Sequence, residues 1–278
     1  MVMIGATGSV SDRLRRLVSF LGKEWSMAGM YRAARLDGVR EAIRSPLEIL
    51  VQNLQASLGG NLESVSVVGS ALTDDFQAGV SDVNTVVLLR EHSVAALHAV
   101  GALAKSMTRH RLSAPLLLTA AYIDRSRDVF GVEFLDFQLT HETILGDDPF
   151  TAIHFDKPDV RLQCERELKA MLVRLRQGYV AAAGDHGLVR DILIATAKGL
   201  APLARALLWL HDAERPRTMK AALQTAGARF GIDLNAAVVA ERWRYEKTRR
   251  PHPEIERTFP ALLEAVDRLA TTIDGMRL

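Results

Sequence analysis

The chain has 278 residues, 48% of them hydrophobic, so it can bury one large core or the cores of two ordinary domains. Its formal net charge of only +2 excludes the strongly basic character of a protein that binds nucleic acid over much of its surface. The single cysteine, Cys164, excludes an intrachain disulfide, and its helical surroundings favour a partly buried small residue over a nucleophile. The N-terminal stretch lacks the basic start and long apolar core of a signal peptide, and no apolar run is long enough to span a membrane. We therefore expect a cytoplasmic protein with no membrane partner.

The N-terminal part is predicted to be helical and basic. Ser11 and Asp12 favour the start of a helix that continues to Leu21, and residues 1–45 are assigned to an N-terminal helical segment. Its arginines could line a binding cleft, although no single position stands out. They are Arg32, Arg35, Arg40 and Arg44.

Residues 46–150 are predicted to form a mixed α/β domain. Its first helix is expected to start at Ser45-Pro46 and to end at Gly59-Gly60, and a second helix is expected from Ser93 to about Arg109. The charged segment 124–128 predicts a turn that joins the last two strands into a hairpin. Four strands rich in apolar residues are expected at 65–68, 85–89, 115–122 and 132–138.

Polar residues stand where the first strand ends and where the second begins. Gly69 and Ser70 follow the apolar run 65–68, and Asp82 and Asn84 open the second strand. Side chains two positions apart on a strand point to the same face, so Asp82 and Asn84 are expected to lie together beside the Gly-Ser turn. The alternative is that both are ordinary polar residues of a strand start, where Asp and Asn favour turns.

This pattern resembles the nucleotidyltransferase superfamily, which includes polymerase β and the kanamycin nucleotidyltransferases. The family signature is an apolar strand, Gly-Ser or Gly-Gly, a short gap, and then Asp-x-Asp or Asp-x-Glu on the next strand. The family also has a third carboxylate on a later strand. Glu133 is the first candidate for it, and Asp136, on the opposite face of a regular strand, is the other. The resemblance covers about residues 47–138.

The resemblance implies Mg²⁺-dependent transfer of a nucleotidyl group from an NTP to an acceptor hydroxyl. It assigns phosphate binding to Gly69 and Ser70, and catalysis and metal binding to Asp82, Asn84 and Glu133. Asn84 departs from the family pattern because its amide carries no negative charge. One weakly held metal ion, or none, is therefore expected in place of two. Lost catalysis and an altered activity both stay open, and Glu133 could equally be an exposed charge on an edge strand.

Residues 157–278 are predicted to form an all-α antiparallel bundle after a linker at 142–155. Asp147 and Asp148, within that linker, are interpreted as an exposed turn in preference to a metal site. Apolar residues spaced three and four apart are typical of amphipathic helices. They predict helices at 158–183, at 188–211, from about 217 to 229, after Asn235, and at 253–273.

A core followed by a bundle also resembles the domain order of the kanamycin nucleotidyltransferases. In those enzymes the bundle forms one wall of the substrate cleft and can supply a base. No motif in this chain identifies that base, and helix position alone offers Glu165, Glu167 and Asp191. Asp74 and Asp75 are interpreted as residues of a solvated loop.

Two features of the bundle support rival hypotheses. Arg205 and His211 resemble the Arg-to-His motif of the HEPN ribonucleases, which implies acid-base work for His211 and phosphate binding for Arg205. The simpler interpretation of His211 is a cation at a helix C-terminus. The second feature is a basic-aromatic stretch that could bind a nucleotide base or RNA, or could be a solvated helix end whose aromatic residues pack inward. It contains Arg242, Trp243, Arg244, Tyr245, Lys247, Arg249, Arg250 and His252.

The sequence thus predicts an α+β protein with a nucleotidyltransferase-like mixed-sheet core, preceding helices and a following helical bundle. The leading hypothesis is nucleotidyl transfer with Mg²⁺ and an NTP to a small molecule, a protein or RNA. One alternative is a catalytically weakened relative that binds a nucleotide or a partner as a regulatory module. The other is a HEPN-like ribonuclease in the bundle. Formation of a homo-oligomer stays open.

Overall fold

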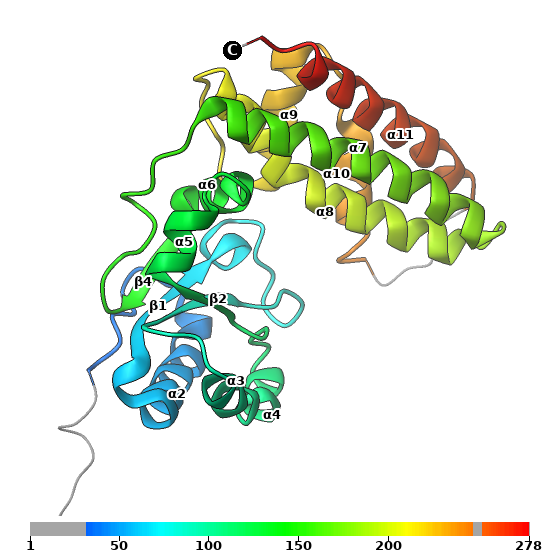
Figure 1. Cartoon of the computed structure of the whole chain (residues 1–278). Coiled ribbons are helices and arrows are strands. Elements are labelled where there is room, and N and C mark those ends of the chain that lie inside the picture. The colour runs from blue at the N-terminus through cyan, green and yellow to red at the C-terminus, as the bar shows by residue number, and fades with distance from the viewer. Residues whose placement is uncertain (1–31, 247–251, 278) are drawn as a thin grey trace, which may run out of the picture. The chain divides into compact units, whose positions relative to one another are not determined.

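The computed structural model describes residues 32–246 and 252–277. The predicted helix from Ser11 to Leu21 lies outside the described residues. Residues 34–278 form one compact unit, which contains a four-stranded sheet flanked by helices and a bundle of longer helices (Figure 1). The predicted α+β class, with a mixed sheet followed by helices, is confirmed.

The sheet has the strand order β3-β2-β1-β4. Its strands are β1 (Leu62–Val68), β2 (Asn84–Leu89), β3 (Leu116–Thr119) and β4 (His141–Leu145). β1 pairs antiparallel with both β2 and β4, whereas β2 and β3 are parallel, so the sheet is mixed. β1 and β2 are almost entirely buried, and this explains why valine and leucine predominate in both and why the buried polar residues of β1, Ser64 and Ser66, are small.

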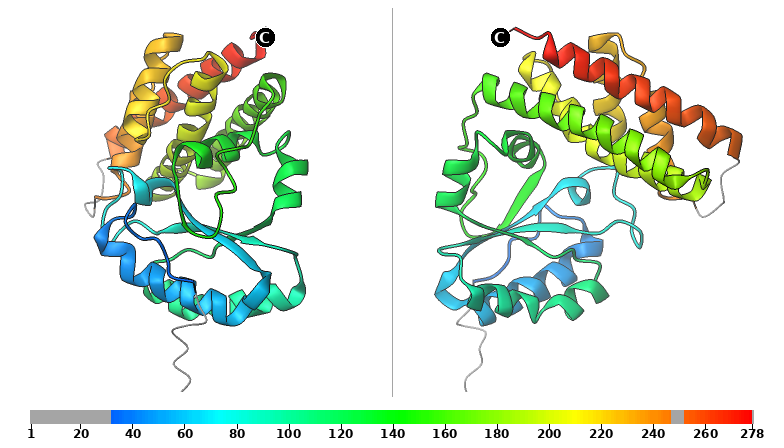
Figure 2. Two further views of the ribbon diagram at one scale, coloured as in Figure 1. Left: turned by 90° about the vertical axis from the view of Figure 1, so that its left-hand side faces the viewer. Right: turned by 45° about the vertical axis from the view of Figure 1, so that its right-hand side comes forward.

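Helices cover both faces of the sheet (Figures 1 and 2). On one face, α2 (Glu41–Leu58), α3 (Val94–Gly101) and α4 (Ala104–Arg109) enclose a core that includes Val65, Val67 and Val87. On the other face, α5 (Ala120–Ser126) and α6 (Gly131–Leu139) pack over Val68, Val86 and Leu88. The alternation of these side chains along β1 and β2 assigns each of them to one of the two cores.

Several boundaries differ from the sequence prediction. α2 starts at Glu41, with Pro46 inside the helix, but it ends as predicted at Gly59, whose φ is +53°. The predicted helix 93–109 is divided into α3 and α4, although Ser93 does cap it by accepting a hydrogen bond from the Ala96 N–H at 3.1 Å.

The largest error concerns the two strands expected at 115–122 and 132–138. The first ends at Thr119, whose hydroxyl accepts a hydrogen bond from the Tyr122 N–H at 3.1 Å and so starts α5. The second is helix α6, so the predicted hairpin does not form. The sheet is completed by β4, which lies in the segment predicted to be a linker.

The bundle follows the prediction closely. Its helices are α7 (Lys157–Ala182), α8 (His186–Leu210), α9 (Met219–Phe230), α10 (Asn235–Arg242) and α11 (His252–Asp274). Cys164 is fully buried in α7, and burial raises the pKa of its thiol to about 12, which favours a structural role.

α8 is the central helix of the bundle. In contrast to the sequence expectation, its length and apolar content would suffice to cross a bilayer. However, 61% of its most apolar window is buried against other helices, as in the core helix of a bundle.

Candidate functional site

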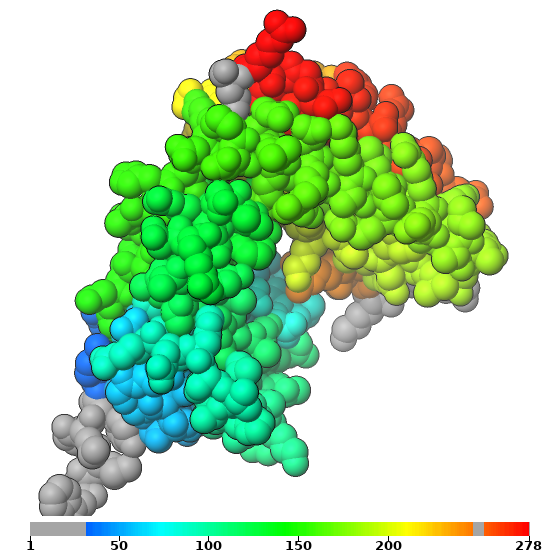
Figure 3. Space-filling view, in the orientation of Figure 1, coloured from blue at the N-terminus to red at the C-terminus, as the bar shows by residue number. Residues whose placement is uncertain are grey.

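A pocket of about 390 Å³ lies where the edge of the sheet meets the bundle. The sheet contributes the end of β1, the 3₁₀ turn η3 (Gly69–Leu72) and the starts of β2 and β3, and α6 closes one side. The bundle contributes α8, the start of α9 and the end of α10 with the turn that follows it. Figure 3 shows the surface hollowed where these two parts of the unit meet.

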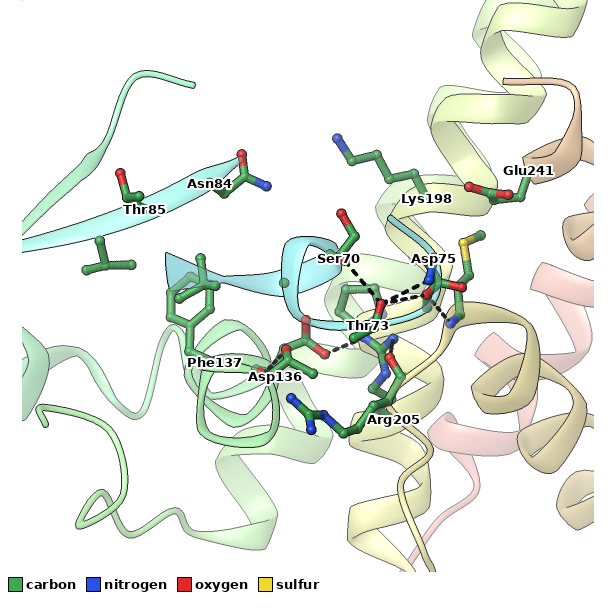
Figure 4. A pocket seen from close by; sticks show the side chains of 18 of the residues that line it. Ser70, Thr73, Asp75, Asn84, Thr85, Asp136, Phe137, Lys198, Arg205 and Glu241 are labelled. Carbon is green, nitrogen blue, oxygen red and sulfur yellow. Dashed lines mark hydrogen bonds and ion pairs between the residues drawn. The ribbon is translucent and has the colours of Figure 1, made fainter. Parts of the chain in front are cut away.

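The predicted Gly-Ser turn and Asn84 meet in this pocket. Gly69 has a φ of +76°, which favours glycine, and its N–H donates to the Thr140 carbonyl at 2.9 Å. The β1–β2 register pairs Val68 with Asn84, so Asn84 lies next to the turn. Ser70 and Asn84 both face the pocket in Figure 4.

Asp82 lies outside the residues that line the pocket. The side chains of Asp82 and Asn84 are exposed while Val83 and Thr85 are buried, so the two point to the same side of the chain, as expected. The Asp82 carboxylate is 56% exposed and lies 3.9 Å from the Arg111 guanidinium.

The structure does not bring a third carboxylate to Asp82 and Asn84. Glu133 is on α6, where its carboxylate accepts a hydrogen bond from the Gln163 amide at 2.6 Å, and it does not line the pocket. On the side of β2 away from β1 lies β3, whose first residue, Leu116, lines the pocket together with Ala114 just before the strand. Within the described ranges, no group of three or more His, Cys, Asp or Glu side chains could hold a metal ion.

Asp136, the other candidate for the third carboxylate, does line the pocket, but it is paired with Arg205 at 2.6 Å. The Arg205 guanidinium also donates to the carbonyls of Pro216 and Arg217, at 3.0 and 2.8 Å. Each of the three guanidinium nitrogens of Arg205 therefore donates to a protein group, and three of its five N–H donors are used.

His211 takes no part in this pocket. Its ring packs edge-on against Phe230 with the centroids 5.1 Å apart. Burial, and then the charges of Arg229 and Lys157, lower the pKa of His211, so it caps the end of α8 without favouring the cationic form expected for it. The structure thus does not combine Arg205 and His211 into one surface.

The bundle wall carries cations that the sequence prediction did not single out. Lys198 of α8 and Arg217, which precedes α9, line the pocket, and neither makes an ion pair within the part of the chain that the structure describes. Arg244 joins them and lies over the Tyr245 ring, 5.4 Å from its centroid. Figure 4 shows Lys198 reaching into the same space as Ser70 and Asn84.

The basic-aromatic stretch divides in two. Trp243 packs inward and is only 1% exposed, whereas Arg244 and Tyr245 line the pocket. Residues 247–251 of this stretch lie outside the described residues.

Two further carboxylates, those of Asp75 and Glu241, line the pocket beside these cations. Asp75 was expected in a solvated loop, but its carboxylate accepts a hydrogen bond from the Met219 N–H at 2.7 Å, at the start of α9. Asp74 is exposed as expected and lies 3.2 Å from Arg40. Burial raises the pKa of Glu241 on α10, and burial together with the charge of Glu241 raises the pKa of Tyr245.

The remaining sequence candidates lie elsewhere. Glu165, Glu167 and Asp191 do not line the pocket, and Glu165 pairs with Arg161 and Lys169 in the bundle. The arginines of the N-terminal part brace loops. Arg35 donates to the Thr143 and Gly146 carbonyls, and Arg40 donates to the Thr73 carbonyl.

No family model matches this chain, and no curated protein matches it either. Among solved structures, it is similar to spectinomycin adenyltransferase AAD(9) from Enterococcus faecialis, a structure that contains ATP and spectinomycin. The likeness has a TM-score of 0.50 and 11% sequence identity, and it covers 82% of this chain and 98% of that one. At this identity the likeness shows the fold alone, and the chain therefore has a nucleotidyltransferase-like fold.

Proposed function

We propose that the pocket binds the triphosphate of a nucleotide. The observation that carries this proposal is that Lys198 and Arg217, for which the described part of the chain provides no carboxylate partner, line the same pocket as the Gly69-Ser70 turn. Arginine and lysine form charge-assisted hydrogen bonds with phosphate oxygens, and a turn with a left-handed glycine lets the backbone approach them closely. The ATP in the similar adenyltransferase structure supports the same assignment.

We infer that nucleotidyl transfer is weakened in this chain. Two Mg²⁺ ions need carboxylates close to the phosphates, and the residues present do not fit that set, because Asn84 is neutral and the pocket side of β3 is apolar. They fit at most one Mg²⁺, held by Asp82, which is two positions from the pocket-lining Asn84 but does not itself line the pocket, and otherwise by phosphate and water. The chain is therefore best described as a nucleotide-binding relative of the nucleotidyltransferases with reduced transfer activity.

The position of Glu241 favours a second candidate, which is retained transfer to a small-molecule hydroxyl. Glu241 lines the pocket from the bundle side, and because burial raises its pKa, its ionised carboxylate is a stronger proton acceptor than that of an exposed glutamate. In this reaction the acceptor oxygen would attack the α-phosphorus, its proton would pass to the Glu241 carboxylate, and pyrophosphate would leave. The spectinomycin in the similar structure supports an acceptor of this size.

Isothermal titration of ATP, GTP, CTP and UTP, with and without Mg²⁺, tests the binding proposal. We expect at least one triphosphate to bind, and we expect Lys198→Gln and Arg217→Gln each to weaken it by about tenfold, the worth of a charge-assisted contact. Lys169→Gln is the matched control, because Lys169 pairs with Glu165 and Asp274 in the bundle. Absence of binding by all four nucleotides, or equal loss in the control, would refute the proposal.

Release of pyrophosphate from the nucleotide that binds, measured with a panel of hydroxyl-bearing small molecules, distinguishes the two candidates. Release that depends on the acceptor and is lost in Glu241→Gln supports transfer. Binding without release supports the nucleotide-binding relative.

A further inference from the structure

Arg205 links three segments at the lower edge of the pocket. It stands on α8 and is only 8% exposed, and it pairs with Asp136 of α6 at 2.6 Å. Its Nε donates to the Pro216 carbonyl at 3.0 Å, and its Nη2 donates to the Arg217 carbonyl at 2.8 Å. One buried guanidinium therefore fixes the connection between α8 and α9 to both helices α6 and α8 (Figure 4).

The same connection is anchored at two further points. Arg215 donates to the Leu135 carbonyl of α6 at 3.3 Å. At the other end, the Met219 N–H donates to the Asp75 carboxylate at 2.7 Å, in the loop that continues from the Gly-Ser turn. The segment 215–219 thus joins α6 to the phosphate-binding side of the pocket.

Arg217 lies in the middle of this anchored segment. Its side chain lines the pocket and has no carboxylate partner among the described residues, while its own carbonyl is held by Arg205. The position of the Arg217 guanidinium consequently depends on a backbone that Arg205 fixes. Arg205 also borders the pocket, but each of its three guanidinium nitrogens already donates to a protein group, which favours a structural task over direct contact with a ligand.

We propose that Arg205 is a positioning residue of the nucleotide site, which acts by holding the segment 215–219 so that Arg217 reaches the nucleotide phosphates. This rests on the proposed binding of a nucleotide triphosphate in the pocket. A guanidinium is needed because its planar fork bonds a carboxylate and two carbonyls at once, whereas a lysine keeps the charge but not this geometry.

Arg205→Lys tests the proposal without leaving Asp136 unpaired. We expect its affinity for the triphosphate to fall by about tenfold, as in Arg217→Gln, and its affinity for the corresponding nucleoside to stay unchanged. In the Arg217→Gln background, Arg205→Lys should cause no further loss, because both changes remove the same phosphate contact. Amide hydrogen exchange in a peptide that covers residues 212–223 should become faster in Arg205→Lys.

Arg161→Lys is the matched control, since Arg161 also joins a carboxylate, Glu165, to a carbonyl, that of Ile273, but within the bundle. It should bind triphosphate and nucleoside as the unmodified protein does. Losses that add fully in the double variant, or an unchanged triphosphate affinity in Arg205→Lys, would overturn the role of Arg205. If the unmodified protein binds no triphosphate, the proposed function itself fails. That result is distinct from the two outcomes that would overturn the role of Arg205 alone.

Discussion

The two walls of the pocket differ in how much charge they carry. The sheet wall keeps the Gly69-Ser70 turn of the fold, but beside it stand the neutral Asn84 and the apolar Ala114 and Leu116. The bundle wall carries Lys198, Arg217, Arg244 and Glu241. The sheet wall thus offers few charges to a ligand, since the carboxylate of its Asp75 already accepts a hydrogen bond from the Met219 N–H, whereas the bundle wall offers several.

Because the two walls differ in this way, nucleotide binding and nucleotidyl transfer can be separated within one fold. Cations on the bundle wall suffice to attract phosphate, because a charge-assisted hydrogen bond needs no metal. Transfer also requires stabilisation of the charge that develops at the reacting phosphate, which carboxylate-bound metal ions normally supply. Substitutions that alter one wall at a time test this separation.

The largest effect is expected from breaking the buried pair on the bundle side. Arg205→Ala leaves the Asp136 carboxylate, whose side chain is 16% exposed, without its counter-ion, and we expect it to destabilise the protein by about 3–5 kcal/mol. Denaturation by urea measures this. Arg176→Ala is the control, because its partner Asp267 is exposed, and its removal should change the stability by less than about 1 kcal/mol. Equal losses of stability in the two variants would show that the Arg205–Asp136 pair stabilises the protein no more than an exposed ion pair does.

A smaller effect is expected at the sheet wall. A Cβ at position 69 would meet no atom within 4 Å, so Gly69→Ala introduces only the strain of a left-handed backbone, about 1–2 kcal/mol. Gly60→Ala is the matched control, since a Cβ there also has space and no positive φ is required. Thermal unfolding should separate the two variants. If Gly69→Ala were as stable as Gly60→Ala, the turn would tolerate a side chain and its glycine would need another explanation.

The sequence was sufficient to predict the sheet wall. Residues 65–68 and 86–89 are rich in valine and leucine because both strands are buried on two faces, and the register of these strands places Asn84 next to the Gly69-Ser70 turn. The long helices of the bundle were also predictable, since apolar residues recur three and four positions apart along them.

The sequence could not identify α6 as a helix. Val132 and Leu135 pack into the bundle core while Phe134 packs against the sheet, so apolar residues occur on two sides of this short segment. Its periodicity therefore resembles that of a buried strand as closely as that of a helix. This error misplaced Glu133 as a neighbour of Asp82.

The bundle wall was beyond prediction for a different reason. Lys198 on α8, Arg217 before α9 and Glu241 on α10 come from three separate segments, and only tertiary packing brings them to Ser70. No local spacing distinguishes them from solvated charges. Arg205 was singled out for its distance from His211, but its partner, Asp136, lies 69 positions away in the chain.

The charge of Glu241 offers a pH-dependent test of the bundle wall. Burial raises its pKa in the folded protein, so the folded state favours the protonated carboxyl, and this group lowers the stability as the pH rises from the unfolded pKa through the folded one. The ionised form also repels phosphate. We therefore expect Glu241→Gln to bind triphosphate several-fold more tightly than the unmodified protein above the pKa of Glu241 and equally well below it.

The affinity of both proteins for the same nucleotide, measured at pH values below and above the pKa of Glu241, gives the effect. Because protonation of the nucleotide affects both proteins equally, it cancels in the ratio of the two affinities. A ratio that does not change with pH would mean that Glu241 does not face the phosphates.

The smallest effect is expected from restoring charge to the sheet wall. Asn84→Asp places a second carboxylate two positions from Asp82 and beside the Gly-Ser turn, and so returns part of the Mg²⁺ ligand set. We expect the triphosphate affinity to become more dependent on Mg²⁺, by a few-fold at most, because β3 still supplies no third carboxylate. Without Mg²⁺ the added charge should weaken binding instead, since it repels the phosphates. Titration with and without Mg²⁺ measures both.

Leu116→Glu in the Asn84→Asp background then extends the test to β3. A gain in Mg²⁺-dependent affinity or in pyrophosphate release in the double variant would show that the sheet wall lacks only its carboxylates. If neither increases, the backbone geometry of this wall is the cause of the weakened transfer.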